Sequence, residues 1–298
     1  MKLKFTAISP VILSPRMEKA LYKGVDFKGI KKDMENSKIE NVGTIKIIYP
    51  FYSYERRDLL DENDFSYAKE YYIPASSLKG ALLSGIKNED ENSFRSSILF
   101  QDIKISKENI ELKNLYKFQY LYQNLYQNDK KKNKDNKQKT DCETPKFSSF
   151  FPSIAIEMIE RGKNFEGEIL LKSGVSEELF KSKLDESFLI TKNKLNNYIK
   201  EIEERIKIIN SWIEDGKLER QVEDSEGNGN YIEKLKSIQK RIKEIQNRKN
   251  IIFLGGYKGI LGSLSEINNT QKIRNGFYID RETMLPYGLV EVGFEKDK

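Results

Sequence analysis

The sequence predicts an α+β protein in which a long helical hairpin interrupts a β-sheet core. Strand patterns occur near both ends of the chain, for example in residues 3–7 and 288–294. Between them, isoleucine and leucine recur at steps of three and four, the spacing of a packed helix face. We therefore expect a sheet core formed by residues 1–175 and 250–298, with residues 176–249 as an antiparallel helical hairpin.

The composition limits the functional classes. The 298 residues carry a formal net charge of +6, a mildly basic balance that suits contact with a polyanion. The chain has 16 tyrosines and 16 phenylalanines, which suit base stacking where they alternate with lysine. It has no histidine, the commonest general base and transition-metal ligand. Its single cysteine, Cys142, excludes an intramolecular disulfide and a cysteine-rich zinc site. We expect no cofactor and no metal.

The N-terminal third predicts strands separated by loops. Residues 3–7 alternate apolar and polar side chains, which is the period of a half-buried strand. Residues 20–42 are polar and predict a long loop, whereas residues 44–49 are rich in β-branched side chains and predict a strand. Residues 97–105 predict a further strand. The N-terminus is too short and alternating for a secretory signal, and no apolar run approaches a membrane span, so we expect a cytoplasmic protein without a membrane partner.

A strand, a tight turn and a helix are predicted around residues 73–86. Pro74 favours an extended residue before it, and Ser76 or Ser77 can cap the helix that follows. Lys79 then lies in the first helical turn, where unpaired amides and the helix dipole favour an anion. Gly80 has no side chain, so a ligand can approach closely. An ordinary capped junction without a ligand is the competing interpretation.

The middle of the chain predicts a strand pair and a basic loop. Residues 147–159 and 165–172 are expected to pair as antiparallel strands that turn at residues 161–164. The apolar run at residues 169–171 predicts burial on both faces of its strand. Residues 129–140 are rich in lysine, and we interpret them as a solvated surface loop rather than a specific RNA contact.

Residues 176–249 predict two long helices. A polar, glycine-bearing gap at residues 224–230 separates two apolar stripes, so the helices are expected to run antiparallel. We expect the stripes to serve packing rather than a cofactor site, although they could also dock a neighbouring subunit. The stripes consist of Leu195, Ile199, Ile202, Ile206, Ile209 and Ile213, and of Ile232, Leu235, Ile238, Ile242 and Ile245.

Glycines are dense between residues 253 and 263. Gly255, Gly256 and Gly259 surround Tyr257 and Lys258, and they allow backbone amides to converge on an oxygen anion. The spacing fits neither a dinucleotide fingerprint nor a P-loop. A flexible turn is the alternative, although a turn needs fewer glycines. Two strands follow this segment, and they should close the sheet.

Four segments resemble a known family. Residues 73–82, Ile-Pro-Ala-Ser-Ser-Leu-Lys-Gly-Ala-Leu, resemble the signature of the RAMP superfamily, the RNA-binding subunits of type III CRISPR effector complexes. Residues 253–263 resemble its C-terminal glycine-rich loop. Residues 99–105 and 157–169 are similar to its strand after the first helix region and to its central strand, turn and strand. Within the superfamily, the chain resembles the capping subunit of the type III-A Csm complex, at the crRNA 3′ end.

The resemblance implies a ferredoxin-like, RRM-like RAMP core and a non-catalytic crRNA-binding subunit. Such a subunit caps the backbone filament and supports crRNA maturation and antiviral defence. The implied partners are crRNA, target RNA and other Csm-complex subunits, especially the backbone RAMP subunit. The expected RNA-binding residues are Ser76, Ser77, Lys79, Gly80, Gly255, Gly256, Tyr257, Lys258 and Gly259, together with Arg16 and Lys19.

The first loop departs from the family pattern. In the resembled family, the opening strand runs into a glycine-containing loop that approaches RNA, but residues 11–19 lack the usual histidine and glycines. Arg16 and Lys19 could still contact phosphates, and a solvated basic loop is an equally open interpretation.

A metal-dependent endoribonuclease, either a backbone RAMP subunit or a crRNA-processing relative, is the alternative function. In the resembled family, the backbone subunit cuts target RNA with an acidic loop residue and a divalent metal, and Asp26 and Asp33 are loop carboxylates here. Two-metal chemistry needs several converging carboxylates, and no acidic cluster in the sequence has that spacing. We therefore expect no catalytic residues.

Overall fold

The structure of the protein is a computed structural model that describes residues 1–31, 34, 37–55, 63–86, 94–122, 143–172, 174–216, 231–267 and 276–294. The predictions for Asp33, Cys142, the lysine-rich loop and the gap between the helices lie outside these residues, as does the side chain of Arg16. The α+β class is confirmed, with mostly antiparallel strand pairs and two long helices. Within the described ranges, no helix is both long and apolar enough to span a membrane.

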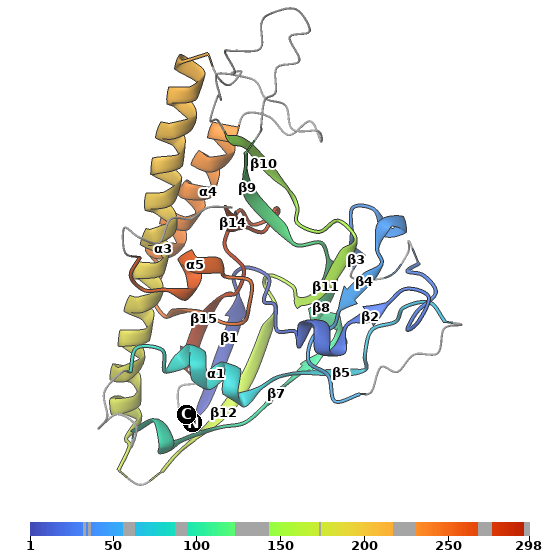
Figure 1. Ribbon diagram of the computed structural model, residues 1–298. Coiled ribbons are helices and arrows are strands. Elements are labelled where there is room, and N and C mark those ends of the chain that lie inside the picture. The colour runs from blue at the N-terminus through green and yellow to red at the C-terminus, as the bar shows by residue number, and fades with distance from the viewer. Residues whose placement is uncertain are drawn as a thin grey trace, which may run out of the picture.

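Distant parts of the chain form the five-stranded central sheet, in the order β13-β15-β1-β12-β6 (Figure 1). All neighbouring strands in this sheet are antiparallel. Strands from the first and last parts of the chain therefore lie side by side. Their bounds are Lys2–Ala7 for β1, Ile98–Phe100 for β6, Asn164–Leu171 for β12, Ile251–Phe253 for β13 and Leu289–Phe294 for β15.

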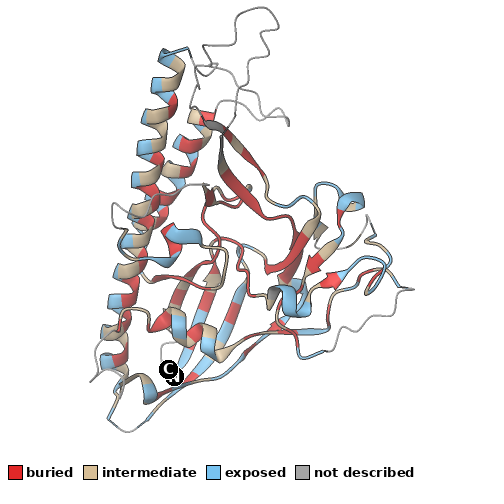
Figure 2. Cartoon of the chain, viewed as in Figure 1, coloured by how far each residue is buried: buried red, intermediate tan, exposed pale blue. Residues whose placement is uncertain are grey.

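One face of the central sheet is buried and the other is open. In β1, Leu3 and Phe5 are buried, as the alternation predicts, whereas Lys2 and Lys4 are exposed and pair with glutamates of β12. The buried side chains of β1 belong to one hydrophobic cluster with leucines of α1 (Ala75–Leu82) and with apolar residues near the start of α3 (Glu177–Glu214). Figure 2 shows this alternation of buried and exposed positions along the central strands. Helices thus cover one face only.

The two long helices lie side by side and run in opposite directions. Ser176 caps α3 by accepting a hydrogen bond from the Leu179 amide at 3.2 Å. Side chains of α4 (Tyr231–Gln246) reach back along α3, because Gln239 donates to Glu203 and Gln246, further along α4, donates to the earlier Asn196. The stripe residues of α4 from Leu235 onward are buried. α3 continues past the central sheet, and its second half packs against α4 (Figure 1).

Three further sheets complete the fold, with the orders β2-β4-β11-β8-β3, β10-β9-β14 and β5-β7. Their strands are β2 (Leu21–Tyr22), β3 (Ser37–Lys38), β4 (Ile47–Tyr49), β5 (Glu70–Ile73), β7 (Ile103–Ser106), β8 (Ile110–Lys113), β9 (Tyr116–Tyr122), β10 (Glu143–Ser149), β11 (Ile154–Ile159) and β14 (Phe277–Tyr278). Short 3-10 helices span Arg16–Lys19, Val42–Thr44 and Lys107–Asn109.

The predicted pairing of the two central strands is wrong. β11 pairs with β4 and β8, whereas β12 pairs with β1 and β6, so the turn between them passes the chain from one sheet to another. Backbone hydrogen bonds hold this turn to Ala7 at the end of β1. The predicted burial on both faces of β12 is also wrong, because Leu170 lies on the open face and is 61% exposed.

Three other strand predictions need adjustment. Residues 97–105 form two strands, since β6 joins the central sheet and β7 pairs with β5. The loop expected at residues 20–42 contains the short strands β2 and β3. Of the two C-terminal strands, β15 closes the central sheet, but β14 pairs with β9. In each case a long-range partner, which periodicity does not identify, decided the outcome.

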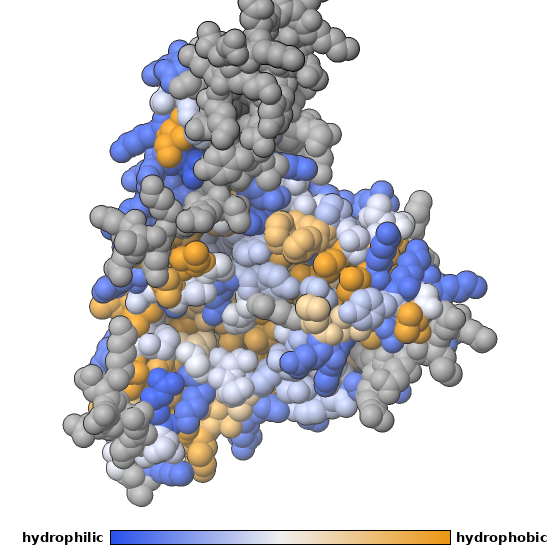
Figure 3. Space-filling view, in the orientation of Figure 1, coloured by the Kyte–Doolittle hydropathy of each residue, from blue (hydrophilic) through white to orange (hydrophobic). Residues whose placement is uncertain are grey.

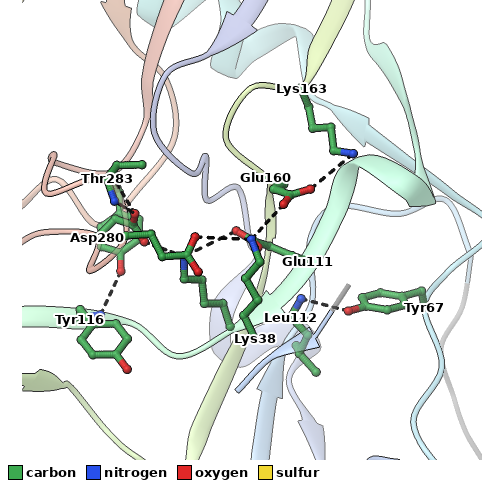
Figure 4. A network of polar contacts seen from close by, with 12 residues as sticks. Lys38, Tyr67, Glu111, Leu112, Tyr116, Glu160, Lys163, Asp280 and Thr283 are labelled. Carbon is green, nitrogen blue, oxygen red and sulfur yellow. Dashed lines mark hydrogen bonds and ion pairs between the residues drawn. The ribbon is translucent and has the colours of Figure 1, made fainter. Parts of the chain in front are cut away.

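A buried ionic cluster ties the C-terminal segment to β8 (Figure 4). The Lys113 ammonium lies 2.8 Å from a carboxylate oxygen of Asp280, and both residues are almost fully buried. Burial alone would lower the pKa of Lys113, but Asp280 and Glu111 raise it above its ordinary value. The other Asp280 oxygen accepts hydrogen bonds from the Thr283 amide and hydroxyl, both at 2.8 Å. The turn that begins at Asp280 is therefore fixed from two sides.

Lys38 extends this cluster to the surface. Its ammonium lies 2.9 Å from Glu160 and 3.0 Å from the buried Glu111. Burial raises the pKa of Glu111, although Lys113 and Lys38 oppose that rise. The cluster joins β3, β8, the turn after β11 and the C-terminal segment.

Candidate nucleic-acid interface

The signature segment forms β5, a turn and α1, but its cap differs from the prediction. Pro74 occupies the N-cap position of α1, and no side chain of the helix caps it. Instead, the Ala75 amide donates to a carboxylate oxygen of Asp102 at 2.7 Å. Ser76 and Ser77 lie inside the first turn, so their predicted role as caps is wrong. Asp102 already supplies negative charge at this helix end, which argues against an anion site there.

Close packing fixes α1 against α3. The Ser187 hydroxyl donates to the Leu82 carbonyl at 2.7 Å and accepts from the Gly85 amide at 3.0 Å. A Cβ at Gly85 would lie 2.8 Å from the backbone of Glu186, so only glycine permits this approach. Further along α3, at steps of four and three, Thr191 and Lys194 continue from Ser187 on the same helix face. This face leads from α1 to the glycine-rich segment.

The glycine loop, residues 254–263, follows β13. Gly255 has φ of +93°, and a Cβ there would lie 2.3 Å from the Ile12 carbonyl oxygen. The Gly256 amide donates to this same oxygen at 2.8 Å, so this amide is used inside the protein. Tyr257 has φ of +56° and Gly259 has φ of +61°. Left-handed residues therefore alternate along the loop, and each one turns the chain tightly.

α3 also holds the glycine loop. The buried Tyr198 hydroxyl donates to the Lys258 carbonyl at 2.7 Å. A Cβ at Gly262 would lie 2.7 Å from the Lys258 Cβ, so glycine is needed in α5 (Gly259–Ser263). The Lys258 ammonium donates to the Phe253 carbonyl at 3.2 Å. Tyr198, which binds the Lys258 carbonyl, lies one helical turn after Lys194 on α3.

Two adjoining cavities separate α1, α3 and the glycine loop, and we call them together the signature cleft. The smaller cavity has a volume of about 300 Å³ and the larger about 530 Å³. Lys194, Gly255 and Lys258 line both cavities. Neither cavity has an aspartate or glutamate among the described residues that line it. Figure 3 shows pale atoms of intermediate hydropathy across the centre of this face, where Figure 1 places α1 and α5.

The signature cleft brings together most of the predicted binding residues. Ser76, Ser77 and Gly80 line the smaller cavity, and Gly256, Tyr257 and Gly259 line the larger one; Gly255 and Lys258 line both. The two signature segments, far apart in the sequence, therefore face the same space.

Lys79 and Lys19 line neither cavity. Ser77, Gly80, Ala81 and Ser84 share one face of the signature segment, and Lys79 lies off that face by its helical spacing. Lys19 is exposed in the 3-10 helix after the first loop. The signature cleft thus draws its positive charge from Lys258 and from a lysine that was not predicted.

Thr191, Lys194 and Tyr278 are three of the lining residues that sequence reasoning missed, and all three lie outside the two signature segments. Thr191 and Lys194 belong to α3, which we had expected to serve packing or to dock a neighbouring subunit. Their signal was present, because Ser187, Thr191 and Lys194 place polar residues at helical spacing beside the apolar stripe. Tyr278 lies in β14, and nothing in its local sequence places it near the glycine loop.

The two lysines of the signature cleft have depressed basicity. Burial lowers the pKa of Lys194, since a charged ammonium loses hydration there. Burial, together with the nearby charge of Lys194, lowers the pKa of Lys258 to about 8. An anion between the two ammonium groups would compensate for their lost hydration and for the repulsion between their charges. The arrangement therefore favours an oxyanion such as a phosphate.

Of the carboxylates considered for catalysis, Asp26 is the one within the described residues. Asp26 accepts a hydrogen bond from the Tyr22 amide at 2.7 Å and so closes a local turn. Within the described ranges, no group of three or more aspartate, glutamate or cysteine residues is arranged to hold a metal ion.

Comparisons with known proteins give a family and distant structural relatives. Residues 57–296 match the family model of the RAMP superfamily. No curated protein sequence matches the chain. One similar solved structure is a chain of a Csm–crRNA–target RNA ternary complex of a type III-A CRISPR–Cas system, with 10% identity, a TM-score of 0.46, and coverage of 98% of this chain and 100% of that chain. Another is Csm5 of T. onnurineus, with 12% identity, a TM-score of 0.38, and coverage of 97% and 99%. The extent of the family match shows that this chain belongs to the RAMP superfamily.

Proposed function

We propose that the protein is a non-catalytic crRNA-binding subunit of a type III-A CRISPR (Csm) effector complex, and that the signature cleft holds the RNA backbone. One observation carries the proposal: both signature segments line one cleft that contains two lysines and, among its described lining residues, no carboxylate. The resemblance to the capping subunit supports a position at the crRNA 3′ end. The partners are then crRNA, target RNA and other Csm-complex subunits, especially the backbone RAMP subunit.

We also infer a ferredoxin-like core with a helical extension within residues 176–249. The order β15-β1-β12-β6, with every neighbouring pair antiparallel, supports this topology. α1 and the first part of α3 then occupy the two helix positions, while the rest of α3 and α4 form the extension. This arrangement places the signature cleft where the core helices meet the last part of the chain.

The smaller cavity supplies the groups that bind a phosphate. Ser76, Ser77 and Ser84 contribute hydroxyl groups, and the two lysines contribute charged donors. The Thr191 hydroxyl already donates to the Ser187 carbonyl at 3.1 Å. Hydrogen bonds from a charged donor to phosphate are shorter and stronger than those between neutral groups. Contacts to phosphate position RNA without reading its sequence, so the affinity should depend on salt more than on base identity.

Lys194→Met and Lys258→Met should each weaken the binding of single-stranded RNA about tenfold or more at moderate salt, because each removes a charge-assisted contact. The double substitution should also reduce the slope of log affinity against log salt by roughly 0.7, the value for one neutralised phosphate on a single strand. Fluorescence anisotropy with the full chain at several salt concentrations measures both effects.

Lys240→Met provides the matched control, because Lys240 is an exposed lysine of α4 that lines neither cavity of the signature cleft. Unchanged affinity and salt slope in the double variant would overturn the proposal. Loss of full-length labelled target RNA on incubation with the chain and Mg²⁺ would overturn its non-catalytic part.

RNA affinity should fall as the pH rises through about 8, because Lys258 has a pKa of about 8 in the empty cleft and loses its charge above it. Below about pH 7 this residue should contribute no pH dependence, since it is already protonated. The groups that face it are Lys194, Tyr198, Tyr257 and Tyr278, and burial raises the pKa of Tyr198, so that phenol stays neutral. Lys258→Arg should flatten the profile, because a guanidinium stays charged. An equally steep fall in the arginine variant would exclude Lys258 as its source.

A further inference from the structure

We propose that the larger cavity of the signature cleft takes the base of one unpaired nucleotide, held against Tyr257 and Tyr278, while the phosphate of that nucleotide lies at Lys194 and Lys258. This inference rests on the proposed RNA-binding function and names the part of the RNA that enters the larger cavity. The inference is carried by the position of two aromatic residues, Tyr257 and Tyr278 (the aromatic wall), beside the two lysines that line both cavities.

The linings of the two cavities differ in a way that assigns the parts of a nucleotide. The hydroxyl groups of Ser76, Ser77, Ser84 and Thr191 line only the smaller cavity, which also has Phe253 in its lining. The rings of Tyr257 and Tyr278 line only the larger one. Lys194 and Lys258 lie at the boundary, because they line both. A phosphate therefore finds its donors at the boundary and in the smaller cavity. The larger cavity offers the ring surface that an unpaired base requires.

The rest of the larger cavity leaves room for a planar group. Besides the two lysines and the two tyrosines, its lining is glycine and Ser263. Its volume of about 530 Å³ lies within the range of small-molecule sites, which combine apolar walls with a few placed polar groups. A second phosphate would find no further cation in this lining. The larger cavity therefore suits an uncharged, planar base better than a second anion.

The aromatic wall is held rigidly by its surroundings. The Tyr257 and Tyr278 rings meet edge to face with centroids 5.8 Å apart, and Phe150 meets Tyr278 in the same manner at 5.6 Å. The nearly buried Lys117 ammonium lies 5.4 Å from the Tyr278 ring centroid and 4.6 Å from that of Phe150. Rings that are already fixed lose little conformational entropy when a ligand binds.

Tyr257 adds a second sign of a ligand site. Its φ of +56° is a conformation that a bulky residue rarely adopts. Such conformations persist where the surrounding structure imposes them, and they concentrate at functional sites. Here the conformation lets a side chain, rather than another glycine, line the larger cavity from within the glycine loop.

Abasic scanning tests the proposal on the unchanged full chain. A short single-stranded RNA of uniform sequence is compared with versions that carry one abasic nucleotide at each position in turn. We expect affinity to fall roughly 5- to 150-fold at one register of the bound strand, the loss typical of one stacked base. Tyr278→Leu should lose the same factor on intact RNA, and the abasic RNA should cause no further loss in this variant. Tyr278→Phe should keep the affinity of the parent chain.

Tyr22→Leu is the matched control, because Tyr22 is a 41% exposed tyrosine of β2 that lies outside both cavities. The proposal is overturned if every abasic RNA binds the unchanged chain as tightly as intact RNA. It is also overturned if the loss of affinity from Tyr278→Leu and the loss from the abasic nucleotide multiply when the two changes are combined. If the lysine substitutions weaken binding while abasic RNA does not, the base site fails but the proposed function stands. If neither the lysine substitutions nor the abasic nucleotides weaken RNA binding, both the base site and the proposed function fail. The abasic scan needs no substitution, so it decides even if Tyr278→Leu does not fold.

Discussion

Lys113→Met should lower the free energy of unfolding by about 3–5 kcal/mol, the cost of removing one partner from a buried ion pair. Lys113 is 2% exposed and lies 2.8 Å from Asp280, which is fully buried. Without the ammonium, the carboxylates of Asp280 and Glu111 lose their nearest buried counter-charge. Urea unfolding of the full chain, followed by circular dichroism, measures the change.

Two further variants separate this ion pair from general effects of charge removal. Lys163→Met removes a half-exposed lysine that lies 3.4 Å from Glu160, and it should cost less than about 1 kcal/mol. Lys113→Met combined with Asp280→Leu removes both partners of the pair, so it should be less destabilised than Lys113→Met alone. A loss of stability in Lys113→Met as small as that in Lys163→Met would contradict the prediction.

The ionic cluster also supports the signature cleft. The C-terminal segment that Lys113 anchors continues to Gly288, whose amide donates to the Pro10 carbonyl at 2.8 Å. The Gly288 carbonyl in turn accepts from the Leu254 amide at 2.8 Å, directly before Gly255. Partial unfolding of this segment would therefore release the start of the glycine loop, so the Lys113→Met chain should lose RNA affinity near its unfolding transition.

Gly255→Ala should destabilise the protein by about 2–4 kcal/mol, from a strained backbone and a steric clash. Gly255 has φ of +93°, and the added Cβ would lie 2.3 Å from a backbone oxygen of Ile12, which cannot move as a side chain does. The loop must shift to relieve the clash, and Lys258 shifts with it, so RNA affinity should fall as well. Thermal unfolding and anisotropy on the same preparation measure the two effects.

Gly80→Ala is the contrasting substitution in the other signature segment. No atom lies within 4 Å of a Cβ at Gly80, which belongs to α1 and lines the smaller cavity. Alanine should therefore stabilise the helix by roughly 0.5–1 kcal/mol, because it restricts the unfolded chain more than glycine does. The methyl group nevertheless enters the cavity, so RNA affinity should fall while stability rises. If Gly255→Ala proved as stable as Gly80→Ala, the close approach at Ile12 would not constrain the loop.

The sequence by itself determined the class of the fold and the family. Side-chain alternation along residues 3–7 and the apolar steps along α3 and α4 are local periodicities, and each follows from which face of one element must be buried. The two signature segments were likewise readable from short stretches of residues, and the family match confirms their assignment to the RAMP superfamily.

Only the tertiary structure decided how these elements meet. β11 and β12 are adjacent in the sequence but belong to different sheets, Asp102 caps α1 in place of a serine, and Lys194 rather than Lys79 faces Lys258. Periodicity specifies which side of an element is buried, but it carries no information about which distant element covers that side. The signature cleft depends on the close approach of α1 and the glycine loop to α3, and that approach is set by packing between segments far apart in the chain.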